Sequence, residues 1–460
     1  MNLLHKDKSD ERQALVNEVE EENEENHSSK KTKNNLVYVS FNFINSIVGS
    51  GIIGMPYAIK KSGIGLGIIF LLLVAFSSDY SLVLLVKGGQ LAGTSNYQDL
   101  VLSSFGKIGF FILSIIQFIY PFIAIISYNV IIGDTIPKVL RRLAHVENDN
   151  ILGNRYFIVF LASVLVTLPL SLSKDIGRLA KISLASLCCV LFLLIVIISR
   201  AITLSPSIPA TKDAWIFANN GIIESLGIMV FAFMCHHNSF LLYDSLDNPT
   251  QSRWNLVTHF SVFISALVTL MFGVIGYVIF TGYTEGDILE NFCKDDDLIN
   301  ITRFIYTVTI MLTYPIECFV CREVIERVLF SYKTFSLQRH ITITGLIVLF
   351  ALLISYSTDC LGIVLEINGV ITATPLAFIL PAMCYIKLYR RSRSLNKDVN
   401  IITSEDTSND SSSGSSLIFA WCTLLFGAAI LVVGFISIII HLYKGVFCSH
   451  GHELFYCLKK

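Results

Sequence analysis

The chain contains several long windows of apolar residues that are almost free of charged side chains, and no other feature restricts its fold as strongly. The window 417–440 has no charged residue, and Arg200 is the only one in the window 182–202. A helix needs about 20 apolar residues to cross the roughly 30 Å core of a bilayer, and it satisfies its backbone hydrogen bonds internally. Only 15% of the residues are charged, against about 25% in a typical globular chain. The sequence therefore predicts an all-α polytopic membrane protein.

Eleven windows are predicted to cross the membrane. Lys and Arg are somewhat more frequent in the connections on the N-terminal side, which predicts a cytosolic N-terminus. With an odd number of spans, the C-terminus is then extracellular. The predicted spans are 36–59, 64–86, 108–136, 156–172, 182–202, 222–243, 256–281, 298–320, 341–356, 361–388 and 417–442.

The distribution of polar residues predicts how the chain is divided. Residues 1–35 are acidic, contain no apolar core, and are expected to form a disordered cytosolic tail. A Ser-rich tract is expected to form a flexible cytosolic loop. The predicted regions are the tail 1–35, a first five-helix half 36–202, a second five-helix half 203–388, the loop 389–416, an eleventh helix 417–442 and an extracellular tail 443–460.

The first predicted span contains residues that a continuous helix tolerates poorly. Pro56 removes one backbone donor, and Gly49 and Gly51 lower the cost of leaving helical geometry. At membrane depth, freed backbone groups are tolerated only where they face protein, a cavity or a ligand. The small residues could instead serve close helix packing, but that role does not require the two Asn residues that accompany them. We predict that residues 47–51 are unwound and line a binding site.

The sixth predicted span repeats this pattern more weakly, because the polar residues 235–238 follow directly on an apolar run. Spans one and six are corresponding members of the two five-span halves. Interrupted helices in corresponding positions indicate an inverted-repeat secondary transporter. His236 and His237 are adjacent and leave a helix in different directions, so we expect no metal site there.

Four short motifs in these spans carry a family resemblance. Residues 42–54 read Asn-Phe-Ile-Asn-Ser-Ile-Val-Gly-Ser-Gly-Ile-Ile-Gly, and residues 231–236 read Phe-Ala-Phe-Met-Cys-His. With Thr-Tyr-Pro at 313–315 and Phe-Ile-Leu-Pro at 378–381, they resemble motifs of the sodium-coupled neutral amino acid transporters, within the amino acid and auxin permease group. The resemblance covers roughly residues 36–441. It implies a LeuT-like 5+5 inverted repeat plus one extra helix, and transport of small neutral amino acids with sodium as the coupling ion and no organic cofactor.

The resemblance also implies which residues bind the ligands. Asn45 and Thr313, with the backbone carbonyl of Ile47, would hold sodium, a hard cation that prefers oxygen ligands. The substrate carboxylate would accept hydrogen bonds from unwound N–H groups, and its ammonium group would face carbonyl groups of the broken sixth span. The implied substrate-binding residues are Ile47, Gly49, Ser50, Gly51, Phe231, Ala232, Phe233 and Met234.

Three residues are candidates for coupling a proton. Asp134 lies in a Gly-Asp-Thr-Ile-Pro sequence that looks more like proton-coupled cousins in the wider group. Glu366 lies in span ten, where the sodium-coupled relatives usually have a small residue, and a carboxylate there is costly unless it is paired or wet. Glu366 could also be a boundary carboxylate that reaches water, and His236 is the third candidate. Glu317 and Glu323 are assigned to the cytoplasmic end of span eight. A proton-coupled amino acid carrier is therefore the alternative function.

Two modifications are considered on the predicted outer side. A bridge between Cys448 and Cys457 could form in an oxidising compartment. The connection between spans five and six lacks Cys, so the extracellular disulfide typical of some relatives has no counterpart there. Asn300 begins an Asn-Ile-Thr sequon, but it is so close to span eight that we expect no glycosylation.

Other classes of function fit the sequence less well. It contains no metalloprotease pair, nucleophile elbow or phosphate-binding loop, so no enzyme activity is expected. Eleven spans do not match a seven-span receptor, and no ion-selectivity filter repeats. A net charge of −1 gives no electrostatic basis for binding nucleic acid. An amino-acid-sensing transceptor stays open. We expect a monomer among membrane lipids, in the plasma membrane rather than the lysosomal membrane.

Overall fold

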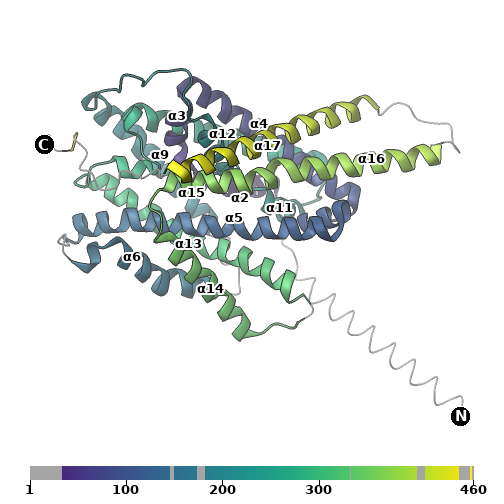
Figure 1. Cartoon of the computed structure of the whole chain (residues 1–460), viewed down its shortest axis with the longest axis horizontal. Coiled ribbons are helices and arrows are strands. Elements are labelled where there is room, and N and C mark those ends of the chain that lie inside the picture. The colour runs from purple at the N-terminus through teal and green to yellow at the C-terminus, as the bar shows by residue number, and fades with distance from the viewer. Residues whose placement is uncertain are drawn as a thin grey trace, which may run out of the picture.

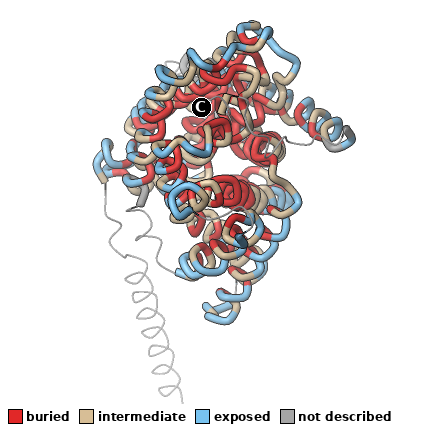
Figure 2. Tube along the Cα trace, turned by 90° about the vertical axis from the view of Figure 1, so that its left-hand side faces the viewer, coloured by how far each residue is buried: buried red, intermediate tan, exposed pale blue. Residues whose placement is uncertain are grey.

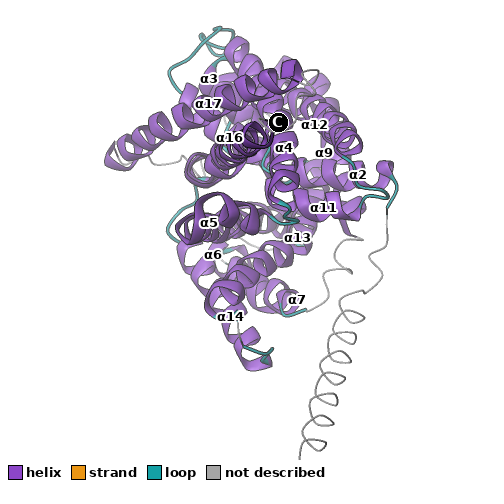
Figure 3. Ribbon diagram, turned by 90° about the vertical axis from the view of Figure 1, so that its right-hand side faces the viewer, coloured by secondary structure: helices purple, strands orange, loops and turns teal. Residues whose placement is uncertain are grey.

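The computed structural model describes residues 34–145, 150–173, 182–331, 333–400, 410–444 and 456–457. These residues form helices joined by turns and loops, and no strand occurs among them (Figure 3). Most of the labelled helices run along the longest axis of the molecule (Figure 1). The predicted all-α fold is confirmed. Almost all of the predicted tail 1–35 lies outside the described residues.

Nine segments of the described chain are long and apolar enough to cross a membrane. The predicted windows overlap these segments, a bent helix pair at residues 36–62, and a shorter apolar segment at 155–171. The nine segments comprise α4 (Ile64–Ala92), α5 (Tyr97–Leu143), α9 (Ile182–Leu204), α10 (Ile222–Ala232) with α11 (Ser239–Ser245), α12 (Gln251–Phe280), α13 (Asp297–Leu329), α14 (Leu337–Ser355), α15 (Leu361–Asn368) with α16 (Leu380–Asn400), and α17 (Asp410–Lys444).

Two segments contain π-helical turns. The shorter apolar segment consists of α6 (Arg155–Ala162), the turn η3 (Ser163–Thr167) and α7 (Leu168–Ser171). Between α15 and α16 the chain forms η8 (Gly369–Ala373) and η9 (Pro375–Ile379). π-Helical turns widen a helix locally and are frequent at functional sites.

Apolar side chains cover the outside of the helices as well as the interior. On α4, Ile69, Leu72 and Phe76 are exposed, and their spacing of three and four residues places them on one helix face. Figure 2 shows buried residues along the inner helix faces and exposed residues toward the periphery. An exposed apolar face of this kind is what contact with lipid requires.

The predicted loop 389–416 is wrong at both of its ends, because α16 continues to Asn400 and α17 begins at Asp410. Hydropathy identifies the apolar part of a helix and not its end. A polar extension of a helix beyond its apolar window is therefore predicted as a loop. The guanidinium of Arg390 lies 5.4 Å from the Trp421 ring centroid, which joins the two extended helices. Residues 401–409 lie outside the described chain.

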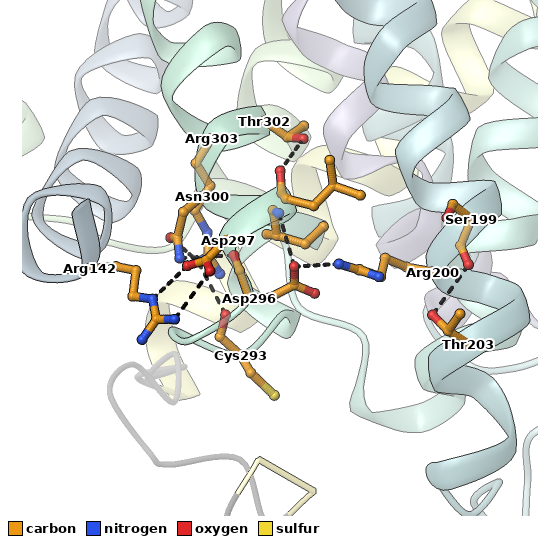
Figure 4. A network of polar contacts seen from close by, with 12 residues as sticks. Arg142, Ser199, Arg200, Thr203, Cys293, Asp296, Asp297, Asn300, Thr302 and Arg303 are labelled. Atoms are coloured by element: carbon orange, nitrogen blue, oxygen red, sulfur yellow. Dashed lines mark hydrogen bonds and ion pairs between the residues drawn. The ribbon is translucent and has the colours of Figure 1, made fainter. Parts of the chain in front are cut away.

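Charged residues fix the chain before α13. Arg142 pairs with Asp297 at 2.6 Å and Arg200 with Asp296 at 2.6 Å (Figure 4). Asn300 is buried, and its amide donates to the carbonyl of Lys294 at 2.8 Å. The amide of this sequon therefore faces the protein interior, where it is inaccessible to a glycosyltransferase.

The predicted Cys448–Cys457 bridge is wrong, because Cys457 forms a disulfide with Cys293. The two bonded residues are separated by 164 positions in the sequence. The bridge ties the C-terminal tail to the loop before α13. The predicted pair rested on both residues lying on the predicted outer side, which does not tell which loops meet in space.

Candidate functional site

The first predicted span is broken in its middle. After α2 (Leu36–Ile47), Val48 and Gly49 are non-helical, and a 3₁₀ turn, η1 (Ser50–Gly54), leads into α3 (Met55–Ser62). Proline is tolerated at the start of α3 because the first N–H groups of a helix have no intrahelical partner. The parts before and after the break are bent by 43°. The predicted departure from α-helical geometry at residues 47–51 is confirmed for residues 48–51, whereas Ile47 is still the last residue of α2.

The sixth predicted span is broken as well. Helix α10 ends at Ala232, residues 233–235 are non-helical, and a 3₁₀ turn, η5 (His236–Asn238), precedes α11. The carbonyl of Met234 accepts a hydrogen bond from the Tyr120 hydroxyl at 3.4 Å. A residue of α5 therefore satisfies one of the backbone groups that the break frees.

The two breaks touch each other. A Cβ atom on Gly51 would lie 2.7 Å from the Cα atom of Ala232 and 3.2 Å from the ring of Phe231. No side chain fits at that distance, so glycine is required at this position. Nearby, the Asn238 amide donates to the Ser46 hydroxyl at 3.0 Å. The unwound parts of both spans therefore form one continuous wall.

A cavity of about 270 Å³ lies against this wall. Its volume is close to the lower end of the range for ligand pockets, about 300–1,000 Å³, and suits a small ligand. Helices α5, α9 and α13 complete the cavity. The residues of α13 in its wall recur every three or four positions, as expected for one face of a helix: Tyr306, Thr309, Ile310, Thr313, Ile316 and Glu317.

Both predicted sodium-binding side chains line this cavity, as does Ile47. The side-chain carbonyl oxygen of Asn45 is buried and has no hydrogen-bond partner among the described residues. The Thr313 hydroxyl donates to the carbonyl of Ile310 at 3.0 Å, so its lone pairs can still face a cation. These oxygen atoms are the donor type that a hard cation prefers.

The structure also brings together most of the predicted substrate-binding residues. Ile47, Gly49, Ser50, Gly51, Phe231, Ala232 and Met234 line the cavity. Phe233 is 1% exposed and is not among the lining residues, because the turn after α10 directs it into the core. A Cβ atom on Gly49 would meet nothing within 4 Å. The backbone at Gly49 therefore faces open space.

Glu366 is buried and paired, away from this cavity. Its carboxylate accepts a hydrogen bond from Ser437 at 3.5 Å and lies 3.6 Å from Nδ1 of His441. The same imidazole lies 2.8 Å from Glu224, which pairs with Lys61 at 2.5 Å. With an exposed fraction of 3%, Glu366 does not reach bulk water. The boundary-carboxylate alternative is therefore wrong, since α17 covers this residue.

The structure does not bring Asp134 to the cavity either. Its carboxylate pairs with Arg155 at 2.5 Å, and oxygens of Asp134, Asp287 and Glu290 lie within 4.8 Å of one another. Glu290 also pairs with Lys138. Asp287 lies in the loop before α13, where burial, with the nearby charge of Glu290, raises its pKa to about 7.

The histidine that lines the cavity is His237, and His236 is not part of the wall. His236 is completely buried, and neither ring nitrogen has a hydrogen-bond partner among the described residues. The break before η5 changes the direction in which successive side chains leave the helix. The sequence therefore does not tell whether His236 or His237 faces the cavity. Phase is readable only within a continuous helix.

The polar cavity residues that sequence reasoning missed include Tyr120, Tyr128 and Glu317. The two tyrosines are eight residues apart on α5, a spacing that places them on the same helix face. Glu317 follows Thr313 by four residues and lies in the cavity wall. Glu317 is not at the end of the helix, where the sequence pattern predicts it, because α13 continues to Leu329.

Comparison with known proteins identifies the family of this chain. The family model described as "Transmembrane amino acid transporter protein" matches residues 32–403. "Putative sodium-coupled neutral amino acid transporter 11" of Danio rerio is 48% identical over 418 residues, covering 91% of this chain and 88% of that protein. The Homo sapiens protein of the same name is 46% identical over 398 residues, covering 86% and 92%.

A more distant relative is "Vacuolar amino acid transporter 2" of Saccharomyces cerevisiae, at 31% identity over 86% of this chain and 83% of that protein. Among solved structures, a manganese transporter of Eremococcus coleocola matches 88% of this chain and 95% of that chain, with 12% identity and a TM-score of 0.47. The family assignment rests on the sequence matches, which cover most of the chain. The chain belongs to the transmembrane amino acid transporter protein family.

Proposed function

We propose that the chain is a secondary active transporter that moves small neutral L-amino acids across a membrane by alternating access, coupled to sodium and to counter-transported protons. The observation that carries this proposal is the small cavity where the breaks of two spans meet at Gly51 and Ala232. The names of the zebrafish and human relatives support the substrate class and the coupling ion.

The proposed architecture has eleven spans. Residues 36–202 and 203–388 would form two five-helix halves of a LeuT-like inverted repeat, and residues 417–442 would add one helix. The breaks in the first and sixth predicted spans support it, because each lies in the first span of its half. In this arrangement the N-terminus is cytosolic, the C-terminus is extracellular, and one bundle moves against the other around a fixed site.

The proposed binding mode uses the backbone that the breaks expose. The substrate carboxylate accepts hydrogen bonds from N–H groups at Gly49 to Gly51, and its ammonium group faces carbonyls of the broken sixth span, residues 231–234. Sodium is held by Asn45, Thr313 and the carbonyl of Ile47. The side-chain oxygen of Asn45, which has no hydrogen-bond partner in the described part of the chain, and the open space at Gly49 support these assignments.

A proton-coupled carrier is the second candidate, and the cluster of Glu366, Glu224 and His441 favours it. Two carboxylates beside one imidazole can exchange a proton as the helices that carry them separate. For the location, we propose the plasma membrane, with an organelle membrane as the alternative that the vacuolar yeast relative supports. We also propose that the transporting unit is a monomer.

Counterflow in proteoliposomes tests transport against sensing. Vesicles that contain the purified chain are loaded with unlabelled amino acid and placed in a trace of labelled amino acid. A transporter exchanges the two, so label accumulates transiently inside. Saturable binding without any exchange would reject transport and favour a sensor.

A further inference from the structure

Glu317 presents a carboxylate to the cavity, and no described residue of the cavity wall neutralises its charge. It lies on the cavity face of α13, four residues after Thr313, a separation of about 6 Å along the helix axis. Its Oε2 atom is buried and has no hydrogen-bond partner among the described residues. Exposed Glu323, six residues further on, is outside the cavity wall.

The wall of the cavity is short of positive charge. Glu317 is its only acidic side chain within the described chain, and no Lys or Arg lines it. The remaining titratable groups of the wall are the phenols of Tyr120 and Tyr128 on α5, the phenol of Tyr306 on α13, and the His237 imidazole at the broken sixth span. With these groups neutral, the cavity wall has a charge of −1.

A transported neutral amino acid does not compensate this charge, because the charges of its carboxylate and ammonium groups cancel. An ionised carboxylate within a membrane protein is costly unless a cation, a proton or water accompanies it. The oxygens of Asn45 and Thr313 line the same cavity and can complete the coordination of a small cation. The cavity therefore has the composition of a site for one positive charge beside an amino acid.

We propose that the Glu317 carboxylate binds one monovalent cation, sodium or a proton, in each transport cycle. The proposal rests on the proposed function, since the bound cation then moves with the amino acid or against it. Glu317 provides the full negative charge that the neutral oxygens of Asn45 and Thr313 lack. It thereby retains the cation while the amino acid occupies the space at the breaks.

The test compares Glu317→Gln, Glu317→Asp and the wild-type full chain in proteoliposomes. Glu323→Gln is the matched control, because it removes the same charge from the same helix outside the cavity. Uptake of a labelled neutral amino acid is measured against sodium concentration at constant pH, and against pH at constant sodium. Counterflow exchange is measured in each variant as a readout that needs no net cation movement.

If the bound cation is sodium, Glu317→Gln should raise the half-saturating sodium concentration about 10- to 100-fold. This is the effect expected when a hydrogen-bonding partner of a charged group is lost. If the bound cation is a proton, the same variant should flatten the pH dependence of uptake and leave its sodium dependence unchanged. In both cases counterflow should persist, Glu317→Asp should recover part of the cation dependence, and Glu323→Gln should behave as the wild type.

Three results would overturn the proposal. Wild-type sodium and pH dependence in Glu317→Gln would show that no coupled cation uses this carboxylate. Loss confined to the uptake of a labelled cationic amino acid, measured in parallel, would assign Glu317 to the substrate instead. Equal loss of all activity, counterflow included, in folded Glu317→Gln and Glu317→Asp would show that amino acid exchange itself needs this carboxylate, and would remove the assignment to a coupled cation.

A separate measurement keeps this proposal distinct from the proposed function. The melting temperature of the detergent-solubilised chain is followed with sodium or pH in the absence of amino acid. Wild type should gain stability from the cation through mass action, and Glu317→Gln should lose that gain. If the wild type shows the gain but no amino acid transport, the cation site stands and the proposed function fails. If the wild type transports amino acid but its melting temperature does not rise with the cation, the proposed cation site is wrong.

Discussion

The Cα atom of Ala232 lies 2.7 Å from the place that a Cβ atom of Gly51 would occupy. This contact joins the 3₁₀ turn after the first break to the last residue of α10. Packed regions respond to an added group by shifting whole elements rather than by yielding locally. A side chain at Gly51 would therefore separate the two broken spans and change the cavity between them.

Gly51→Leu should abolish uptake while the protein still reaches the membrane. Overpacking of this kind costs about 1–3 kcal/mol, less than the stability of most folded proteins. Gly345→Leu is the control, because a Cβ atom there would meet nothing within 4 Å. Uptake and surface expression are measured together, and normal substrate affinity in Gly51→Leu would refute the close contact.

Asn45→Ala and Thr313→Ala should raise the sodium concentration that gives half-maximal uptake. In the proposed site, each variant removes one oxygen ligand of sodium and leaves the proposed backbone contacts to the substrate in place. Thr423→Ala is the control, because Thr423 donates to the Phe419 carbonyl at 2.9 Å on α17, away from the cavity. Uptake that is equally high in choline and in sodium buffer would exclude sodium coupling.

Transport should be electrogenic when more sodium ions enter than protons leave in each cycle. One inward charge per cycle is driven by about 2.3 kcal/mol per 100 mV of membrane potential. A neutral amino acid should therefore evoke an inward current that grows as the membrane is hyperpolarised. Uptake without any current at several potentials would mean that the sodium charge is compensated, as by a proton moving outward.

Glu366→Gln should reduce the dependence of uptake on external pH, with substrate binding retained. The neutral amide can replace the hydrogen-bond acceptor but cannot exchange a proton with His441 or Glu224. His441→Gln should have a similar effect, since its imidazole lies between the two carboxylates. An unchanged pH profile in both variants would remove this cluster from the coupling mechanism.

Asp287 should make the folded protein less stable as pH rises. Burial raises its pKa in the folded protein to about 7, above the ordinary value of about 3.9. The folded state therefore holds the proton more tightly than the unfolded state, and the resulting stabilisation is complete below about pH 3.9. That contribution is progressively lost as the pH increases toward 7. Asp287→Asn should flatten this dependence, as measured by melting temperature between about pH 5 and pH 8. A steeper decline in the variant would contradict the assignment.

The breaks could be predicted because they are a property of local backbone chemistry. Pro and Gly act on the residues next to them, so the sequence around Gly49 and Pro56 was sufficient to locate the first break. Apolar windows likewise located the membrane-embedded parts of the helices. Both signals depend on near neighbours and need no knowledge of how distant segments meet.

The missed features depend on distant segments. The Cys293–Cys457 bridge joins residues 164 positions apart, and the partners of Glu366 come from α10 and α17. Glu317 lies inside the predicted window 298–320, but only the packing of α13 against the two breaks shows that it faces the cavity. These relationships follow from packing between elements, which a single sequence pattern does not record.

The most direct test of the account is gradient-driven uptake of a labelled small neutral amino acid into proteoliposomes that contain the purified chain. An inward sodium gradient should concentrate the label above its external level, and choline in place of sodium should abolish the accumulation. Gly51→Leu, prepared in parallel, should show none. Equilibration without accumulation under a sodium gradient, a proton gradient or both would contradict secondary active transport at this cavity.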